Sequence, residues 1–87
     1  MFILLTDGKA LEFHGAHITV NTKHATPYYH VNVIDYNANR AANNEIVYST
    51  PNEETAKQLI ANFCTAAGEG LLVFPIAEWE NKKAKEV

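Results

Sequence analysis

Residues 11–20 read LEFHGAHITV, and the spacing of their apolar side chains changes phase at the Gly-Ala pair. The apolar residues before this pair lie at odd positions and those after it at even positions: Leu11, Phe13, Ile18 and Val20. Side chains alternate between the two faces of a strand, so a straight strand would expose half of this set. Glycine tolerates the backbone conformations of a bulge or bend. We therefore predict that residues 9–21 form one strand bent at Gly15, or two strands that meet there.

The segment before this bend has the pattern of a β-hairpin. Asp7-Gly8 lies between two apolar runs, and this dipeptide is typical of a two-residue type I′ turn. Such a turn pairs strands at residues 2–5 and 9–14, with Thr6 opposite Lys9. In that register the core face carries Phe2, Leu4, Leu11 and Phe13, and the other face carries Ile3 and Leu5.

Two further strands and an exposed loop are expected in the middle of the chain. Residues 28–36, YYHVNVIDY, alternate between apolar and polar side chains, which is typical of a half-buried strand. The asparagine-rich residues 37–44 predict an exposed loop, and residues 45–50, EIVYST, predict a short strand.

A helix is predicted to follow, with Thr50 as its N-cap, Pro51 at its first position and Glu53 completing a capping box. Its apolar side chains recur every three or four residues, at Ala56, Leu59, Ile60, Phe63, Cys64 and Ala67. This stripe predicts a buried face that includes Cys64. Gly68 is expected to end the helix.

The C-terminal part combines an apolar run with a weakly amphipathic segment. Residues 71–75, LLVFP, predict a strand buried on both faces or at the centre of the sheet. Pro75 permits a new helix, for which Trp79 is the main anchor. Residues 81–87 are expected to form a frayed, charged tail.

These elements predict a single α+β domain over residues 1–87. The expected order is β-β-β-β-α-β with a short C-terminal helix. A mainly antiparallel sheet would pack one face against the amphipathic helix, which gives a two-layer arrangement.

Composition narrows the expected location and partners. Seven Lys and Arg against ten Asp and Glu give a formal charge of −3, which argues against nucleic acid and anionic membranes as partners. The single cysteine permits no internal disulfide and favours a reducing compartment. No apolar run approaches the ~18 residues of a membrane span. We therefore expect a cytoplasmic protein without a cofactor.

The sheet face away from the helix is the candidate partner surface. Its expected apolar residues are interleaved with neutral polar ones, which is the composition of a protein–protein interface core. The candidate residues are Ile3, Leu5, Ile34 and Tyr36, together with Arg40 and Tyr48. We predict a non-enzymatic protein-binding module, either a homo-oligomer or a regulator or inhibitor of a larger protein. Alternatively, the C-terminal segment folds over this face.

Three other functions are weighed against protein binding. Tyr28, Tyr29, His30 and Tyr36, with Lys23 and Arg40 nearby, could stack unpaired bases, although the negative charge argues against it. His14 and His17 lie on one face if the strand bends at Gly15, but stable zinc sites need three or four ligands. No spacing predicts a catalytic group, so we expect no enzyme. Size and layout resemble many small bacterial or phage accessory proteins.

Overall fold

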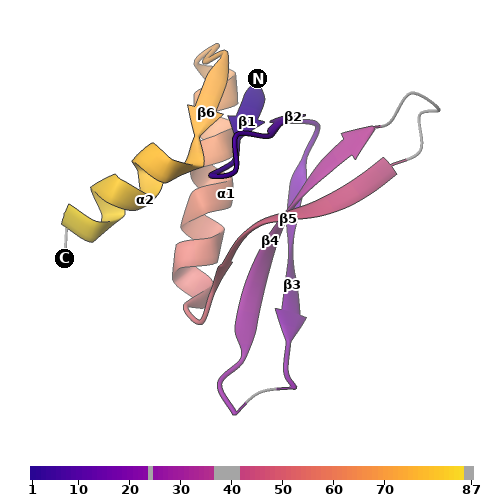
Figure 1. Cartoon of the computed structure of the whole chain (residues 1–87), viewed down its shortest axis with the longest axis vertical. Coiled ribbons are helices and arrows are strands. Elements are labelled where there is room, and N and C mark those ends of the chain that lie inside the picture. Colours follow the sequence, from indigo (N-terminus) through magenta and orange to yellow (C-terminus); the bar gives the residue numbers. More distant parts are fainter. Residues whose placement is uncertain (24, 37–41, 86–87) are drawn as a thin grey trace.

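The computed structural model describes residues 1–23, 25–36 and 42–85. These residues form two sheets and two helices (Figure 1). The elements are β1 (Phe2–Leu4), β2 (Ala10–Glu12), β3 (Ala16–Asn21), β4 (Tyr28–Tyr36), β5 (Ala42–Thr50), α1 (Glu53–Gly68), β6 (Val73–Pro75) and α2 (Ile76–Lys85). The strand orders are β2-β1-β6 and β3-β4-β5, with β1 and β6 parallel and the other pairs antiparallel. The predicted α+β class is confirmed, with two small sheets in place of one.

The chain leaves the first sheet and enters the second at Gly15. β2 ends at Glu12 and β3 begins at Ala16, so the second form of our prediction, two strands meeting at this glycine, is confirmed. Gly15 has a φ of 155°, a conformation that residues with a Cβ rarely adopt. The bend lets odd positions of β2 and even positions of β3 face one core.

We expect Gly15→Ala to lower the free energy of unfolding by about 1–3 kcal/mol because of backbone strain. An added Cβ would lie 3.5 Å from Ile34 Cδ1, an ordinary contact, so steric overlap adds little. Gly68→Ala is the matched control, because Gly68 lies in α1 with no atom within 4 Å of an added Cβ. This control should be neutral or stabilising by up to about 1 kcal/mol. Equal effects of the two variants in urea unfolding would contradict a strained Gly15.

The first hairpin has a three-residue turn, and this corrects the predicted register. Gly8, with a φ of 90°, donates its N–H to Leu5 O at 3.0 Å, and Leu5 N–H donates to Lys9 O at 2.8 Å. Leu5 therefore faces Lys9, and Ile3 pairs with Leu11. We predicted that Phe2 faces the core and that Ile3 lies on the other face. This is wrong, because Ile3 is fully buried and Phe2 is 48% exposed.

The second sheet faces the core with the residues that we expected, except at its end. Ile18 pairs with Val31 and Ala16 with Val33, and both valines are fully buried. Val20 pairs with Tyr29 near the end of the ladder and is 51% exposed, which corrects its predicted burial. β5 begins at Ala42, inside the segment predicted as a loop.

The core forms where α1 packs against both sheets. Its buried apolar residues are Ile3, Leu11, Val31, Val33, Ala56, Leu59, Phe63, Ala66, Phe74 and Ile76. Phe63 lies at its centre, with ring centroids 5.6 Å from Phe13 and 4.9 Å from Phe74. Cys64 is exposed, so its predicted burial is wrong.

The predicted end of α1 at Gly68 is confirmed, whereas its predicted N-cap is displaced by two residues. Asn52 is the N-cap, and its side chain accepts the Thr55 N–H at 3.2 Å, while Thr50 is buried at the end of β5. Just after the helix, the Gly70 N–H donates to Ala67 O and the Leu71 N–H donates to Ala66 O. This is the Schellman pattern with a left-handed glycine, φ 80°, at Gly70.

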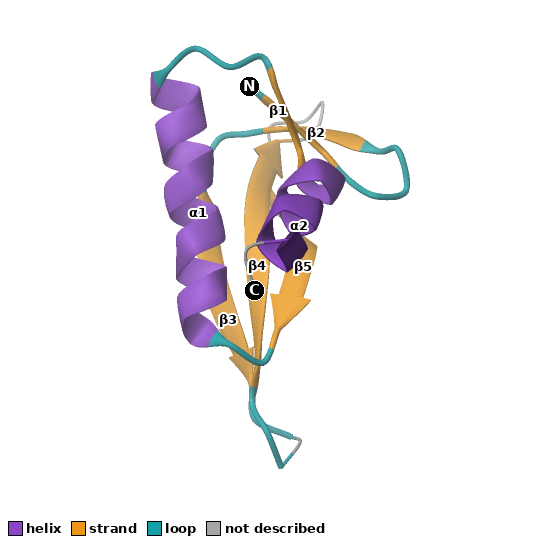
Figure 2. Cartoon of the chain, turned by 90° about the vertical axis from the view of Figure 1, so that its left-hand side faces the viewer, coloured by secondary structure: helices purple, strands orange, loops and turns teal. Residues whose placement is uncertain are grey.

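The helix α2 lies on the same side of the β3-β4-β5 sheet as α1 (Figure 2). Trp79 of α2 packs edge-on against Tyr48 of β5, with centroids 5.3 Å apart, and Tyr48 pairs with buried Val31. The predicted anchoring role of Trp79 is confirmed, but α2 covers the inner face and not the reverse of this sheet. Residues 81–85, expected in a frayed tail, are helical.

Candidate binding surface

Three of the predicted partner-binding residues belong to the interior. Ile3 is fully buried and Leu5, just after β1, packs partly buried against the core, because the three-residue turn directs these two residues inward. Tyr48 is half-buried against Trp79. The pKa of the Tyr48 phenol is raised, mainly by burial and to a smaller extent by the nearby Glu80 carboxylate. Their predicted placement on an open face is wrong.

The other three predicted residues are only partly placed by the structure. Ile34 is half-buried in β4, and its N–H donates to Gly15 O at 2.9 Å. Tyr36 is the last residue of β4, and its side chain lies outside the described part. Arg40 lies outside the described residues altogether. The predicted set therefore does not come together as one surface among the described residues.

The reverse of the β3-β4-β5 sheet, which we call the open face, is mainly polar. Cross-strand pairs place on it His17, Thr19, His30, Asn32, Ile46 and Ser49. His30 Nδ1 and Ser49 Oγ are hydrogen-bonded at 2.6 Å, and Asn32 Nδ2 donates to Thr19 Oγ1 at 3.0 Å. Four of the five polar side chains named here are therefore hydrogen-bonded to one another, which leaves few of them to bind a partner.

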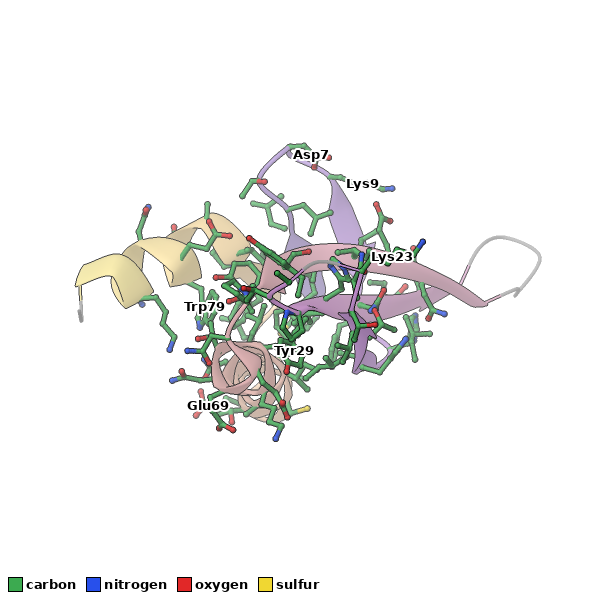
Figure 3. All side chains as sticks on the ribbon, turned by 90° about the horizontal axis from the view of Figure 1, so that it is seen from below. Asp7, Lys9, Lys23, Tyr29, Glu69 and Trp79 are labelled. Atoms are coloured by element: carbon green, nitrogen blue, oxygen red, sulfur yellow. The ribbon has the colours of Figure 1, made fainter. Side chains whose placement is uncertain are left out.

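The tyrosines expected to stack bases are divided between the two faces of β4. Tyr28 is 40% exposed, whereas its neighbour Tyr29 packs partly buried against the core and lies toward α1 (Figure 3). The described residues therefore do not form the predicted tyrosine platform.

The pKa of Glu53, at the start of α1, is lowered by the neighbouring Lys57 ammonium and to a smaller extent by the Tyr29 hydroxyl.

Lys9, on the first hairpin, forms an ion pair with Glu45. Lys9 Nζ donates to both carboxylate oxygens of Glu45, at 2.8 and 2.9 Å, and this pair raises the pKa of Lys9. The contact joins the hairpin to β5. Lys9 is thus held by a carboxylate and is not presented alone to a phosphate backbone.

The two histidines beside Gly15 do not assemble a metal centre in the described part of the chain. His14 Nε2 lies 3.6 Å from a carboxylate oxygen of Glu12. Among the residues described, no group of three or more His, Cys, Asp or Glu side chains is placed to hold an ion.

An exposed apolar patch lies instead beside β6. Four large side chains are involved: Phe2 is 48% exposed, Leu71 45%, Leu72 78% and Val73 45%. Phe2 pairs with Val73 across the parallel ladder and donates its N–H to Leu72 O at 2.8 Å. The backbones of these four residues, termed the apolar patch, therefore lie next to one another.

The local sequence forces this patch outward. The Schellman turn at Gly70 ends α1, and α2 begins at Ile76 directly after Pro75, so β6 has only three residues. Phe74 is the one residue of β6 that is buried, at 8% exposure. LLVFP is thus an edge strand with a buried phenylalanine, which corrects our prediction of a strand buried on both faces.

Two grooves flank Trp79 next to the apolar patch. The first, of about 390 Å³ and termed the β6 groove, is lined mainly by Leu71, Val73, Pro75, Glu78, Trp79 and Lys82. The second, of about 360 Å³, lies between α1 and α2, and Lys83 donates to Gln58 across it. Figure 3 places Trp79 in the angle between the two helices. The patch adjoins the β6 groove, since the two share Leu71 and Val73.

No family model matches the chain, and no curated protein or solved structure is significantly similar to it. Within the described residues, neither helix is long and apolar enough to cross a membrane.

Proposed function

We propose that this chain is a small non-enzymatic module that binds protein through the apolar patch. The observation that supports it is the exposure, by 45–78%, of four large apolar side chains that adjoin a groove. Single exposed apolar residues are ordinary, whereas a contiguous group beside a groove is typical of an interaction site. Full burial of an exposed side chain of this size contributes about 1.5–3 kcal/mol, so covering one that is already half buried contributes roughly half as much.

The charges around the patch indicate the class of partner surface. Glu78 and Lys82 line the β6 groove together, so its rim has no strong net charge. An apolar protein surface suits this rim better than a polyanion does. We place the module in the cytoplasm as part of the same proposal, since its one cysteine suits a reducing compartment. Its partner is a second copy or a larger protein that it regulates.

Leu72→Glu and Ile46→Glu form a matched pair for testing this proposal. Both residues are exposed, by 78% and 53%, but Ile46 lies on the open face. We expect Leu72→Glu to weaken binding at least about tenfold, because in the complex a charge would replace an apolar side chain that the partner covers. Tagged forms of the chain would be incubated with extract of the source cell and with an untagged copy.

The proposal requires a stoichiometric protein partner, self or other, that the unmodified chain and Ile46→Glu retain and Leu72→Glu loses. A partner that all three forms hold equally would contradict it. The absence of any bound protein at high concentration of the chain would contradict it as well. Circular dichroism confirms that both variants keep the fold.

A further inference from the structure

We infer that the partner is a second copy of this chain, docked about a two-fold axis through the apolar patch and α2. This inference rests on the proposed function and specifies its partner. Three observations carry it: a protruding side chain next to a groove, a self-complementary pair of charges, and a blunted strand edge.

The shape of the surface suits an isologous interface. Leu72 is the most exposed large apolar residue of the described chain, and its sequence neighbours Leu71 and Val73 line the β6 groove. A two-fold axis beside the groove brings Leu72 of each copy against the groove of the other. An isologous contact needs such complementary features close together on one surface, because each copy supplies both.

The charges on α2 are self-complementary in the same geometry. Glu78 and Lys82 lie one helical turn apart and both line the β6 groove. When a two-fold axis sets two α2 helices antiparallel, Glu78 of one copy faces Lys82 of the other, and the reverse contact forms at the same time. A strongly acidic or basic partner would meet one repulsive charge here, whereas a second copy meets none.

The edge of β6 favours contact through side chains over strand addition. β6 pairs with β1 on one side and has only three residues, the last of which is Pro75. Proline has no N–H to donate, and short strands containing it resist pairing with a new strand. A second copy therefore docks by burying the apolar patch and not by extending the sheet.

The expected affinity follows from the size of the surface. Four partly exposed large side chains correspond to an apolar patch on the order of 300 Å², and α2 adds to it. A standard interface takes about 800 Å² from each partner. We therefore expect a weak dimer, with a dissociation constant on the order of tens to hundreds of micromolar.

Sedimentation equilibrium over a concentration series tests this dimer. We expect the unmodified chain and Ile46→Glu to dimerise, and Leu72→Glu to associate at least about tenfold more weakly. Trp79, the single tryptophan, lines the groove, so its fluorescence should change with concentration only in the forms that dimerise.

Charge exchange between two variants tests the two-fold geometry. Glu78→Lys and Lys82→Glu should each be largely monomeric, because like charges then face one another across the axis. Their mixture should form a heterodimer, since each lysine of one variant meets a glutamate of the other. This result depends on contact between copies and not on the fold of either variant.

A monomeric unmodified chain throughout the series would overturn the inference. So would a dimer that Leu72→Glu leaves intact, or a mixture of the charge variants that does not associate. The proposed function survives this failure if a different protein is held by the unmodified chain and lost by Leu72→Glu. Both fail if no protein binding depends on Leu72.

Discussion

We expect Phe63→Ala to lower the free energy of unfolding by about 3–5 kcal/mol. Phe63 is fully buried and packs against Phe13 and Phe74, so the truncation leaves a cavity where α1 meets the first sheet. A small domain has a total stability of about 5–15 kcal/mol, of which this loss is a large part. Urea unfolding, followed by Trp79 fluorescence and by circular dichroism, measures it.

Phe63→Leu is the matched control for this cavity. It retains most of the apolar contact in the core, so we expect a clearly smaller cost than for alanine. Nearly equal stabilities of the unmodified chain and Phe63→Ala would mean that the core is not assembled around this ring.

The second large effect concerns two neighbours in β1. We expect Ile3→Ala to cost about 2–5 kcal/mol, because Ile3 is fully buried opposite Leu11. Phe2→Ala should cost less than about 1 kcal/mol, although it removes the larger side chain, because Phe2 is 48% exposed. Both variants would be unfolded in urea at low protein concentration, so that self-association does not stabilise either one.

The order of these two costs reports the register of the hairpin. A two-residue turn at Asp7-Gly8 would direct Phe2 inward and Ile3 outward, and would make Phe2→Ala the more damaging change. The three-residue turn gives the opposite order. A larger loss for Phe2→Ala would therefore contradict the register in which Ile3 pairs with Leu11.

The fold class and the bend at Gly15 could be predicted because both depend on a phase that the sequence displays directly. Odd apolar positions before Gly15 and even ones after it can share a core only if the chain breaks between them. The existence of α1 also followed from its apolar spacing. Its end at Gly68 was predicted as well, but its start was not, because Thr50 and Asn52 are both good caps and β5 includes Thr50.

Which residues of β1 face the core could not be predicted, because this depends on whether the turn has two residues or three. Asp-Gly fits a two-residue turn and also a three-residue turn with glycine at its last position. The structure has the second, in which Asp7 Oδ1 also accepts the Lys9 N–H at 2.9 Å. One residue more in the turn reverses the face of every residue in β1, including Ile3, and that of Leu5 just after it, and both were predicted to bind a partner.

The apolar patch was missed because an apolar run was taken as evidence of burial. The signal that could have found it is the spacing between α1 and α2. A glycine turn and a following helix confine the strand to residues 73–75. Leu71 and Leu72 lie before this strand begins, so the strand does not bury them. The contact with Phe2 depends on the parallel pairing of β1 with β6, which no local pattern predicts.

The exposure of the apolar patch is most directly measured by thiol labelling. In a Cys64→Ser chain, Leu72→Cys is compared with Ala66→Cys, which places the thiol at a site only 9% exposed in α1. At low protein concentration we predict that the thiol at position 72 reacts nearly as fast as in the urea-unfolded chain, while that at position 66 is strongly protected. Equal protection of the two thiols would place Leu72 inside the fold and would contradict the proposed binding surface.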